Sequence, residues 1–131
     1  MVATNLFIAL SLAAAAPSSI SAMRWEKRVL LVAAPGGQDA SLQQQRRIIS
    51  RWRDAAAERD LDVVEIAGDQ VTGASESAAT LRKRFQVPTK GFSALLIGKD
   101  GGTKLRQTRP ISAALLEETI DAMPMRRQER R

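Results

Sequence analysis

The stretch from Lys90 to Arg106, KGFSALLIGKDGGTKLR, constrains the fold more than any other part of the sequence. Within this stretch, the segment Ser93–Ile97 is wholly apolar apart from Ser93 itself, which predicts a strand buried on both faces. Lys99–Gly102 follows with an Asp-Gly pair, a strong hairpin signal between two strand-like runs. Thr103–Arg106 alternates in polarity, so it returns as a half-exposed strand. The stretch therefore predicts a central strand folded onto an edge strand.

Two further strands are predicted upstream. Val29–Ala34 contains six consecutive apolar residues, which favours a second central position. Leu61–Ala67 is interrupted by Asp62 and Glu65, which favours an edge position. Gly68–Gly73 is expected to be loop.

Three helices are predicted between and after these strands, each opened by a serine cap. They begin at Ser41, Ser75 and Ser112 and end at Arg59, Val87 and Pro124. The order is then β-α-β-α-β-β-α, with the first two strands parallel and the hairpin antiparallel. With the apolar strands in the middle, this is an α/β fold with a mixed four-stranded sheet, the arrangement of the thioredoxin core.

Composition excludes several classes of chemistry. The chain of 131 residues contains no cysteine and no histidine, which excludes a thiol nucleophile, a disulfide, a Cys/His zinc site and a Ser-His dyad. We therefore expect no cofactor, no metal and no thiol-based redox activity. Aromatic residues make up 4%, which argues against domains that stack nucleic-acid bases.

The first 22 residues are typical of a secretory signal peptide. Leu6–Ala16 is an apolar run, and small residues before Met23 permit cleavage after Ala22. Two alternatives stay open: the segment is kept as an N-terminal anchor, or translation begins at Met23. We expect export, to the periplasm or the cell exterior, of a domain over residues 23–127 with no transmembrane segment.

The C-terminus is strongly basic. The sequence has 20 Lys+Arg against 14 Asp+Glu, and the last six residues contain four arginines and one glutamate. Residues 128–131 are expected to form a solvated basic tail, with binding to an anionic surface as the alternative. Arg126 is expected to pack on the domain, beside Asp121.

Several strings resemble one known family. They are RWEKRVLLVAAP, ERD, LRKRFQVP, GFSALLIGKDGGTKLR and IDAMPMRR, which together extend from Arg24 to Arg127. The chain resembles a domain of unknown function found in small exported bacterial proteins. The same domain occurs in vertebrate extracellular proteins of the equarin, sushi-repeat and coiled-coil-domain-protein-eighty group, where it is called peroxiredoxin-like.

The resemblance implies a thioredoxin-like fold, export and, for the vertebrate members, adhesion or matrix association. In thioredoxins and peroxiredoxins the working cysteine lies near the start of the helix after the first strand, where this chain has the thiol-free stretch Pro35–Ser41. Pro88 is the nearest counterpart of the thioredoxin cis-proline, although residues 89–92 separate it from the hairpin strand.

The candidate ligand site is the start of the first long helix, with Gly36, Gly37, Asp39 and Ser41, together with Pro88. Free backbone N–H groups and the positive end of the helix dipole suit an anion there. The simpler alternative is an ordinary capped helix start. The expected function is binding or interaction with a protein or an anionic surface. The alternatives are an enzyme that uses Asp39, Ser41 or Lys99, and an adhesive module that self-associates.

Overall fold

Residues 16–131 are described by the computed structural model of the chain, and most of the predicted leader, residues 1–15, lies outside them. The described chain is a mixed α/β structure with one sheet. In chain order its elements are α1 (Ile20–Met23), β1 (Arg28–Ala34), α2 (Ala40–Arg51), α3 (Arg53–Glu58), β2 (Leu61–Ala67), β3 (Gln70–Thr72), α4 (Ala78–Phe85), β4 (Ser93–Ile97), β5 (Thr103–Gln107), α5 (Ala113–Asp121) and α6 (Pro124–Glu129).

The sheet has five strands in the order β3-β2-β1-β4-β5. The predicted parallel pairing of β1 with β2 and the antiparallel hairpin of β4 with β5 are confirmed. The prediction of four strands is wrong, because Gln70–Thr72 pairs with the end of β2 and turns part of the expected loop Gly68–Gly73 into a strand. Leu61–Ala67 is therefore not an edge strand.

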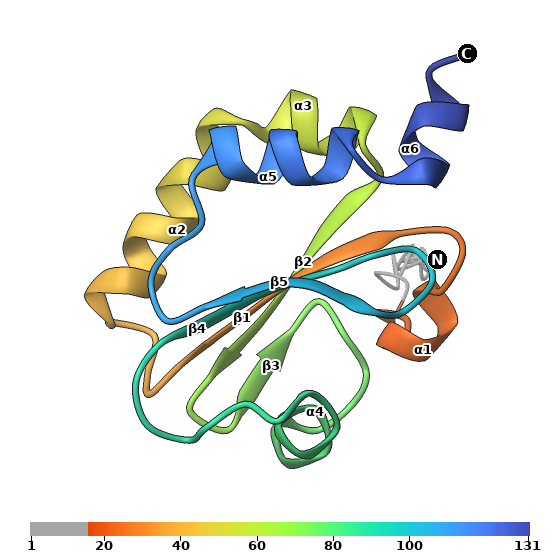
Figure 1. Ribbon diagram of the computed structural model, residues 1–131. Coiled ribbons are helices and arrows are strands. Elements are labelled where there is room, and N and C mark those ends of the chain that lie inside the picture. The colour runs from red at the N-terminus through yellow and green to blue at the C-terminus, as the bar shows by residue number, and fades with distance from the viewer. Residues whose placement is uncertain (1–15) are drawn as a thin grey trace, which may run out of the picture.

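Helices cover both faces of the sheet, with α2, α3 and α5 on one side and α1 and α4 on the other (Figure 1). Each face has its own apolar cluster, because alternate residues of β1 and β4 point in opposite directions. Leu31 lies in the cluster under α4, and Leu96 lies in the cluster under α2 and α5. Both side chains are fully buried, as predicted.

Two predicted helix starts are wrong by two residues. Asp39, not Ser41, caps α2 by accepting a hydrogen bond from the Leu42 N–H, and Ser77, not Ser75, caps α4. In each case the side chain that accepts this bond lies immediately before the first helical residue, which is the position from which a cap reaches the free N–H groups. Ser112 caps α5 as predicted.

The first long helix is also divided in two. The chain leaves helical geometry at Trp52, with φ −109° and ψ 10°, so that α2 and α3 are separate elements. Trp52 is partly buried and packs against the apolar cluster under α2 and α5.

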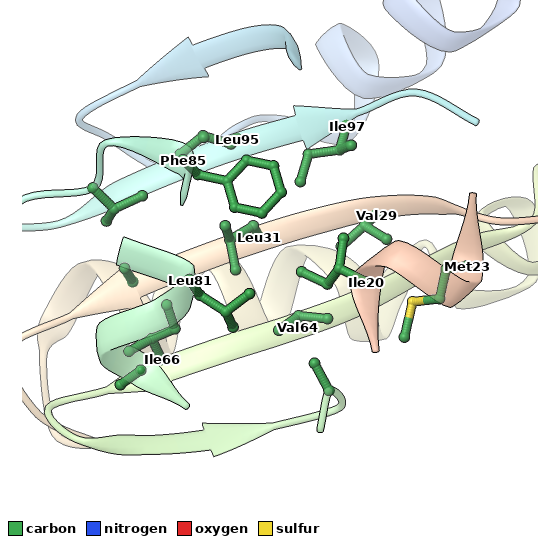
Figure 2. Packing of buried hydrophobic residues seen from close by; sticks show 14 residues of the cluster. Ile20, Met23, Val29, Leu31, Val64, Ile66, Leu81, Phe85, Leu95 and Ile97 are labelled. Carbon is green, nitrogen blue, oxygen red and sulfur yellow. The ribbon is translucent and has the colours of Figure 1, made fainter. Parts of the chain in front are cut away.

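The segment before β1 is part of the fold. Ile20 and Met23 of α1 pack beside Val29 and Val64, as Figure 2 shows. The Ile20 N–H also donates to both carboxylate oxygens of Glu76, at 2.9 and 3.1 Å. Cleavage after Ala22 would therefore remove a core residue and its hydrogen bonds.

Among the described residues, no helix has the length and apolar character that crossing a bilayer requires.

Candidate functional site

At the start of α2, polar groups of the predicted site residues already make hydrogen bonds within the chain. The Asp39 carboxylate caps the helix, and the Gly37 carbonyl accepts a hydrogen bond from the Gln43 side chain at 2.7 Å. A Cβ atom added at Gly36 or Gly37 would meet nothing within 4 Å, so the fold itself does not require glycine there.

Pro88 lies at the same end of the sheet. Its carbonyl accepts a hydrogen bond from Arg82, which also donates to the Gly68 carbonyl at 3.3 Å. The Gly68 N–H in turn donates to the Ala34 carbonyl at the end of β1. The peptide bonds of residues 16–131 are all trans, that of Pro88 included. These hydrogen bonds link Pro88, through Arg82 and Gly68, to the end of β1. None of the five predicted site residues lines either of the two cavities described below.

The opposite end of the sheet carries a cluster of buried charge that the sequence interpretation missed. Arg28, the first residue of β1, has no exposed surface. Its two terminal nitrogens donate to the Glu129 carboxylate at 3.1 and 2.8 Å, and one of them also donates to the Arg59 carbonyl at 2.8 Å. Glu129 therefore belongs to the folded domain, and its assignment to a solvated tail is wrong.

Lys99 completes this cluster from the hairpin turn. Its ammonium group donates to Asp60 at 2.8 Å and to Glu129 at 2.9 Å. Burial lowers the pKa of Lys99, but the hydrogen bonds to these carboxylates outweigh it and the net shift is upward. The hydrogen bonds from Arg28, with those from Lys99, lower the pKa of Glu129 from 4.5 to about 2 despite its partial burial. Lys99 and Glu129 are thus both charged at neutral pH.

A second ionic cluster lies beside the first and joins α3, α5 and α6. The Asp121 carboxylate accepts hydrogen bonds from Arg59 at 3.1 and 3.0 Å and from Arg126 at 3.1 Å. Arg126 also donates to Glu58, at 2.9 Å, and is almost fully buried. The prediction that Arg126 packs on the domain beside Asp121 is confirmed.

A half-open cavity of about 290 Å³ lies against the first cluster. Its wall is formed by Arg28, Lys104, residues 98–100 of the hairpin turn, Thr119 and residues 122–125 at the junction of α5 and α6. Ala122, Met123, Pro124 and Met125 make one side apolar. The Nε–H of Arg28 is buried and has no hydrogen-bond acceptor among residues 16–131. We call this space the hairpin–helix cavity.

A second cavity, of about 230 Å³, lies under α2. Most of its polar side chains are already paired: the Gln45 side chain exchanges two hydrogen bonds with the Ile111 backbone, and Arg46 binds Glu65. Among residues 16–131, the hairpin–helix cavity is the larger of these two and has an apolar side, at residues 122–125.

One sequence signal could have indicated this site. Arg28, Leu30 and Val32 are alternate residues of β1, so their side chains point to the same face of the sheet. Leu30 and Val32 belong to the apolar cluster under α2 and α5. A charged residue at a core-facing position of a strand is unusual unless a group of opposite charge or a hydrogen-bond partner lies beside it. Its partner Glu129 is 101 positions away, and no local pattern identifies it.

Comparisons with known proteins agree with the resemblance to a family of unknown function. The family described as Domain of unknown function (DUF4174) matches residues 19–129. A relative from Danio rerio, named Coiled-coil domain-containing protein 80, is 29% identical over 132 residues. The matched span covers 84% of this chain but only 15% of the relative. The name of this relative states neither a ligand nor a reaction.

Proposed function

The chain belongs to the family described as Domain of unknown function (DUF4174), and from that premise we propose that it is a binding module whose ligand occupies the hairpin–helix cavity. The observation that carries the proposal is the half-open cavity of about 290 Å³, whose wall combines the apolar residues 122–125 with the polar side chains of Lys99, Lys104 and Thr119. Small-molecule sites in proteins combine apolar walls with a few such polar groups.

The state of the candidate catalytic residues favours binding over catalysis. Lys99 is held as a paired cation, since its pKa is raised by hydrogen bonds that outweigh burial, and an ammonium group is neither a base nor a nucleophile. Asp39 is engaged as a helix cap. With no cysteine or histidine in the sequence, the remaining means of acid–base or covalent chemistry are few.

The module is proposed to have a thioredoxin-like core and to act outside the cytoplasm. The first proposal is supported by the run β2-β1-β4-β5 within the sheet, with one parallel and two antiparallel pairings, to which β3 adds an outer strand. The second is supported by the apolar run Leu6–Ala16 and the small residues after it.

The test is a screen of small molecules by ligand-observed NMR, with two matched variants. Ala122 is exposed on the wall of the cavity, and Ala114 is exposed on α5 outside the wall. Ligands should be lost with Ala122→Trp, which fills the mouth, and kept with Ala114→Trp. Hits that bind both variants equally would contradict a function at this cavity.

A further inference from the structure

The donor side chains on the wall of the hairpin–helix cavity differ in how far they are already paired, and this difference identifies a class of ligand. Resting on the proposed function, we infer that the cavity takes an aliphatic monocarboxylate. Its carboxylate is bound by the ammonium group of Lys104, and its alkyl chain lies against residues 122–125.

Three of the four donor side chains in the described wall are engaged inside the protein. Arg28 is fully buried, its Nε–H included, and both of its terminal nitrogens donate to a carboxylate. Lys99 is almost fully buried and binds two carboxylates. The Thr119 hydroxyl donates its single proton to the Leu115 carbonyl at 2.7 Å. The fourth donor is Lys104.

Lys104 is available to a ligand. Its side chain is 35% exposed, and among the described residues its ammonium group has one partner, the Asp100 carboxylate at 2.7 Å. Asp100 is itself 45% exposed, and pairs in such contact with solvent contribute little stability. The Asp100 carboxylate also accepts the Gly102 N–H at 2.9 Å, so it keeps a donor when Lys104 turns to a ligand. An ammonium group has three donors, which allows Lys104 to bind both carboxylates.

Gly98 determines where the Lys104 side chain lies. A Cβ atom added at Gly98 would lie 2.6 Å from the Cε of Lys104 and 3.4 Å from its Cγ. The aliphatic part of the lysine therefore crosses directly over the glycine, and its ammonium group lies beside Asp100 on the hairpin turn. Because residues 98–100 of this turn form part of the cavity wall, the charge is held at the cavity.

The charges of the wall favour an anion. The residues that form the described wall include three cationic side chains, Arg28, Lys99 and Lys104, and one carboxylate, Asp100. The chain as a whole has a formal net charge of +6, which favours the approach of anions over cations. A carboxylate would form a charge-assisted hydrogen bond with Lys104, which is roughly twice as strong as a bond between neutral groups.

The opposite side of the cavity defines the rest of the ligand. Met123, Pro124 and Met125 present apolar surface, and methionine adapts to irregular aliphatic shapes. The volume of about 290 Å³ lies at the lower end of the usual range for small-molecule sites. A short alkyl chain therefore fits the cavity better than a large ring system.

The experiment compares octanoate, octanamide and octylamine, which have alkyl chains of similar length and differ in the head group. Their affinities for the full chain are measured by calorimetry at neutral pH. We expect octanoate to bind, octanamide to bind about ten-fold more weakly, and octylamine not to bind. The ten-fold difference is that between a charge-assisted and a neutral hydrogen bond.

The matched variants are Lys104→Gln and Lys83→Gln, which each remove one positive charge. Lys83 is exposed on α4 and does not line the cavity. Octanoate should bind Lys104→Gln about ten-fold more weakly than wild type and should bind Lys83→Gln as tightly as wild type. Octanamide should bind all three proteins equally. Both replaced side chains are in contact with solvent, so the variants are expected to fold.

Three outcomes overturn the inference, and they are distinguishable from failure of the proposed function. If octanamide or octylamine binds as tightly as octanoate, with binding still lost in Ala122→Trp, the ligand class is wrong and the proposed function stands. If Lys104→Gln and Lys83→Gln affect octanoate equally, Lys104 does not bind the carboxylate. If none of the three probes binds, the monocarboxylate inference fails. The proposed function then fails as well if the small-molecule screen also yields no ligand sensitive to Ala122→Trp.

Discussion

Replacing Glu129 with glutamine is expected to destabilise the protein strongly, although only two residues follow it in the sequence. The carboxylate holds Arg28 through two hydrogen bonds and Lys99 through a third. Glutamine has the same shape but no charge, so the variant leaves the fully buried Arg28 without its counter-ion. The result is a direct measure of the buried cluster.

The magnitude follows from two independent estimates. The pKa of Glu129 falls from 4.5 to about 2. A shift of this size corresponds to at most about 3 kcal/mol of folding free energy, and solvent screening of the partly exposed carboxylate reduces it. Removing one partner of a buried ion pair costs about 3–5 kcal/mol, and the 27% exposure of the Glu129 side chain places this pair at the low end. A loss of about 2–3 kcal/mol lowers the melting temperature of a domain of this size by roughly 10 °C.

The assay is urea unfolding of wild type and Glu129→Gln across a pH series, with Glu118→Gln, at an exposed site on α5, as the control. Because the folded-state pKa is depressed, the carboxylate contributes its full stability above the ordinary value of 4.5 and loses it as pH falls towards 2. The difference between wild type and variant should therefore be largest at neutral pH and vanish below about pH 2. A Glu129 variant as stable as the control at neutral pH would refute the reasoning.

Three further predictions concern the core, the N-terminus and redox chemistry. Leu96→Ala should cost about 2–5 kcal/mol, since the side chain is fully buried, whereas Lys104→Ala should cost less than about 1 kcal/mol; equal urea midpoints would contradict this. If the chain is exported, mass spectrometry of the native protein should find an N-terminus no later than Ser18, because the Ser18 carbonyl accepts a hydrogen bond from the Ser75 N–H and Ile20 belongs to the core. A chain beginning at Met23 would contradict this prediction. Pure, metal-free protein should turn over neither peroxide nor an insulin disulfide, because it has no cysteine.

The main strands were predictable because each contains its own signal. Leu61–Ala67 and Ser93–Ile97 have the predicted bounds, and Val29–Ala34 differs from β1 by one residue. A continuous apolar run indicates a buried strand, and the Asp-Gly pair indicates a hairpin turn. The three residues of β3, Gln70–Thr72, are too few and too polar to show the alternation of a strand, so the sequence did not predict this additional strand.

The site depended on contacts that no local pattern contains. The start of α2 was predicted as a site from its helix dipole, yet Asp39 is engaged there in an ordinary cap. The buried cluster instead joins the first residue of β1 to the last residue of α6 through Arg28 and Glu129. Only the tertiary fold brings these two residues together, and a terminal glutamate between arginines has the composition of a solvated tail.

The central claim, that the hairpin–helix cavity is the ligand site, is tested most directly by mapping a bound ligand on the protein. A ¹⁵N-labelled sample of the full chain is titrated with a ligand found in the screen, and the backbone amide signals are followed by NMR. The account predicts that the signals of Gly98, Lys99 and Thr119, which line the cavity, move with saturation while those of Gly36 and Gly37, which do not line it, stay in place. A ligand that moves the Gly36 and Gly37 signals and leaves those of the cavity wall unchanged would contradict the account.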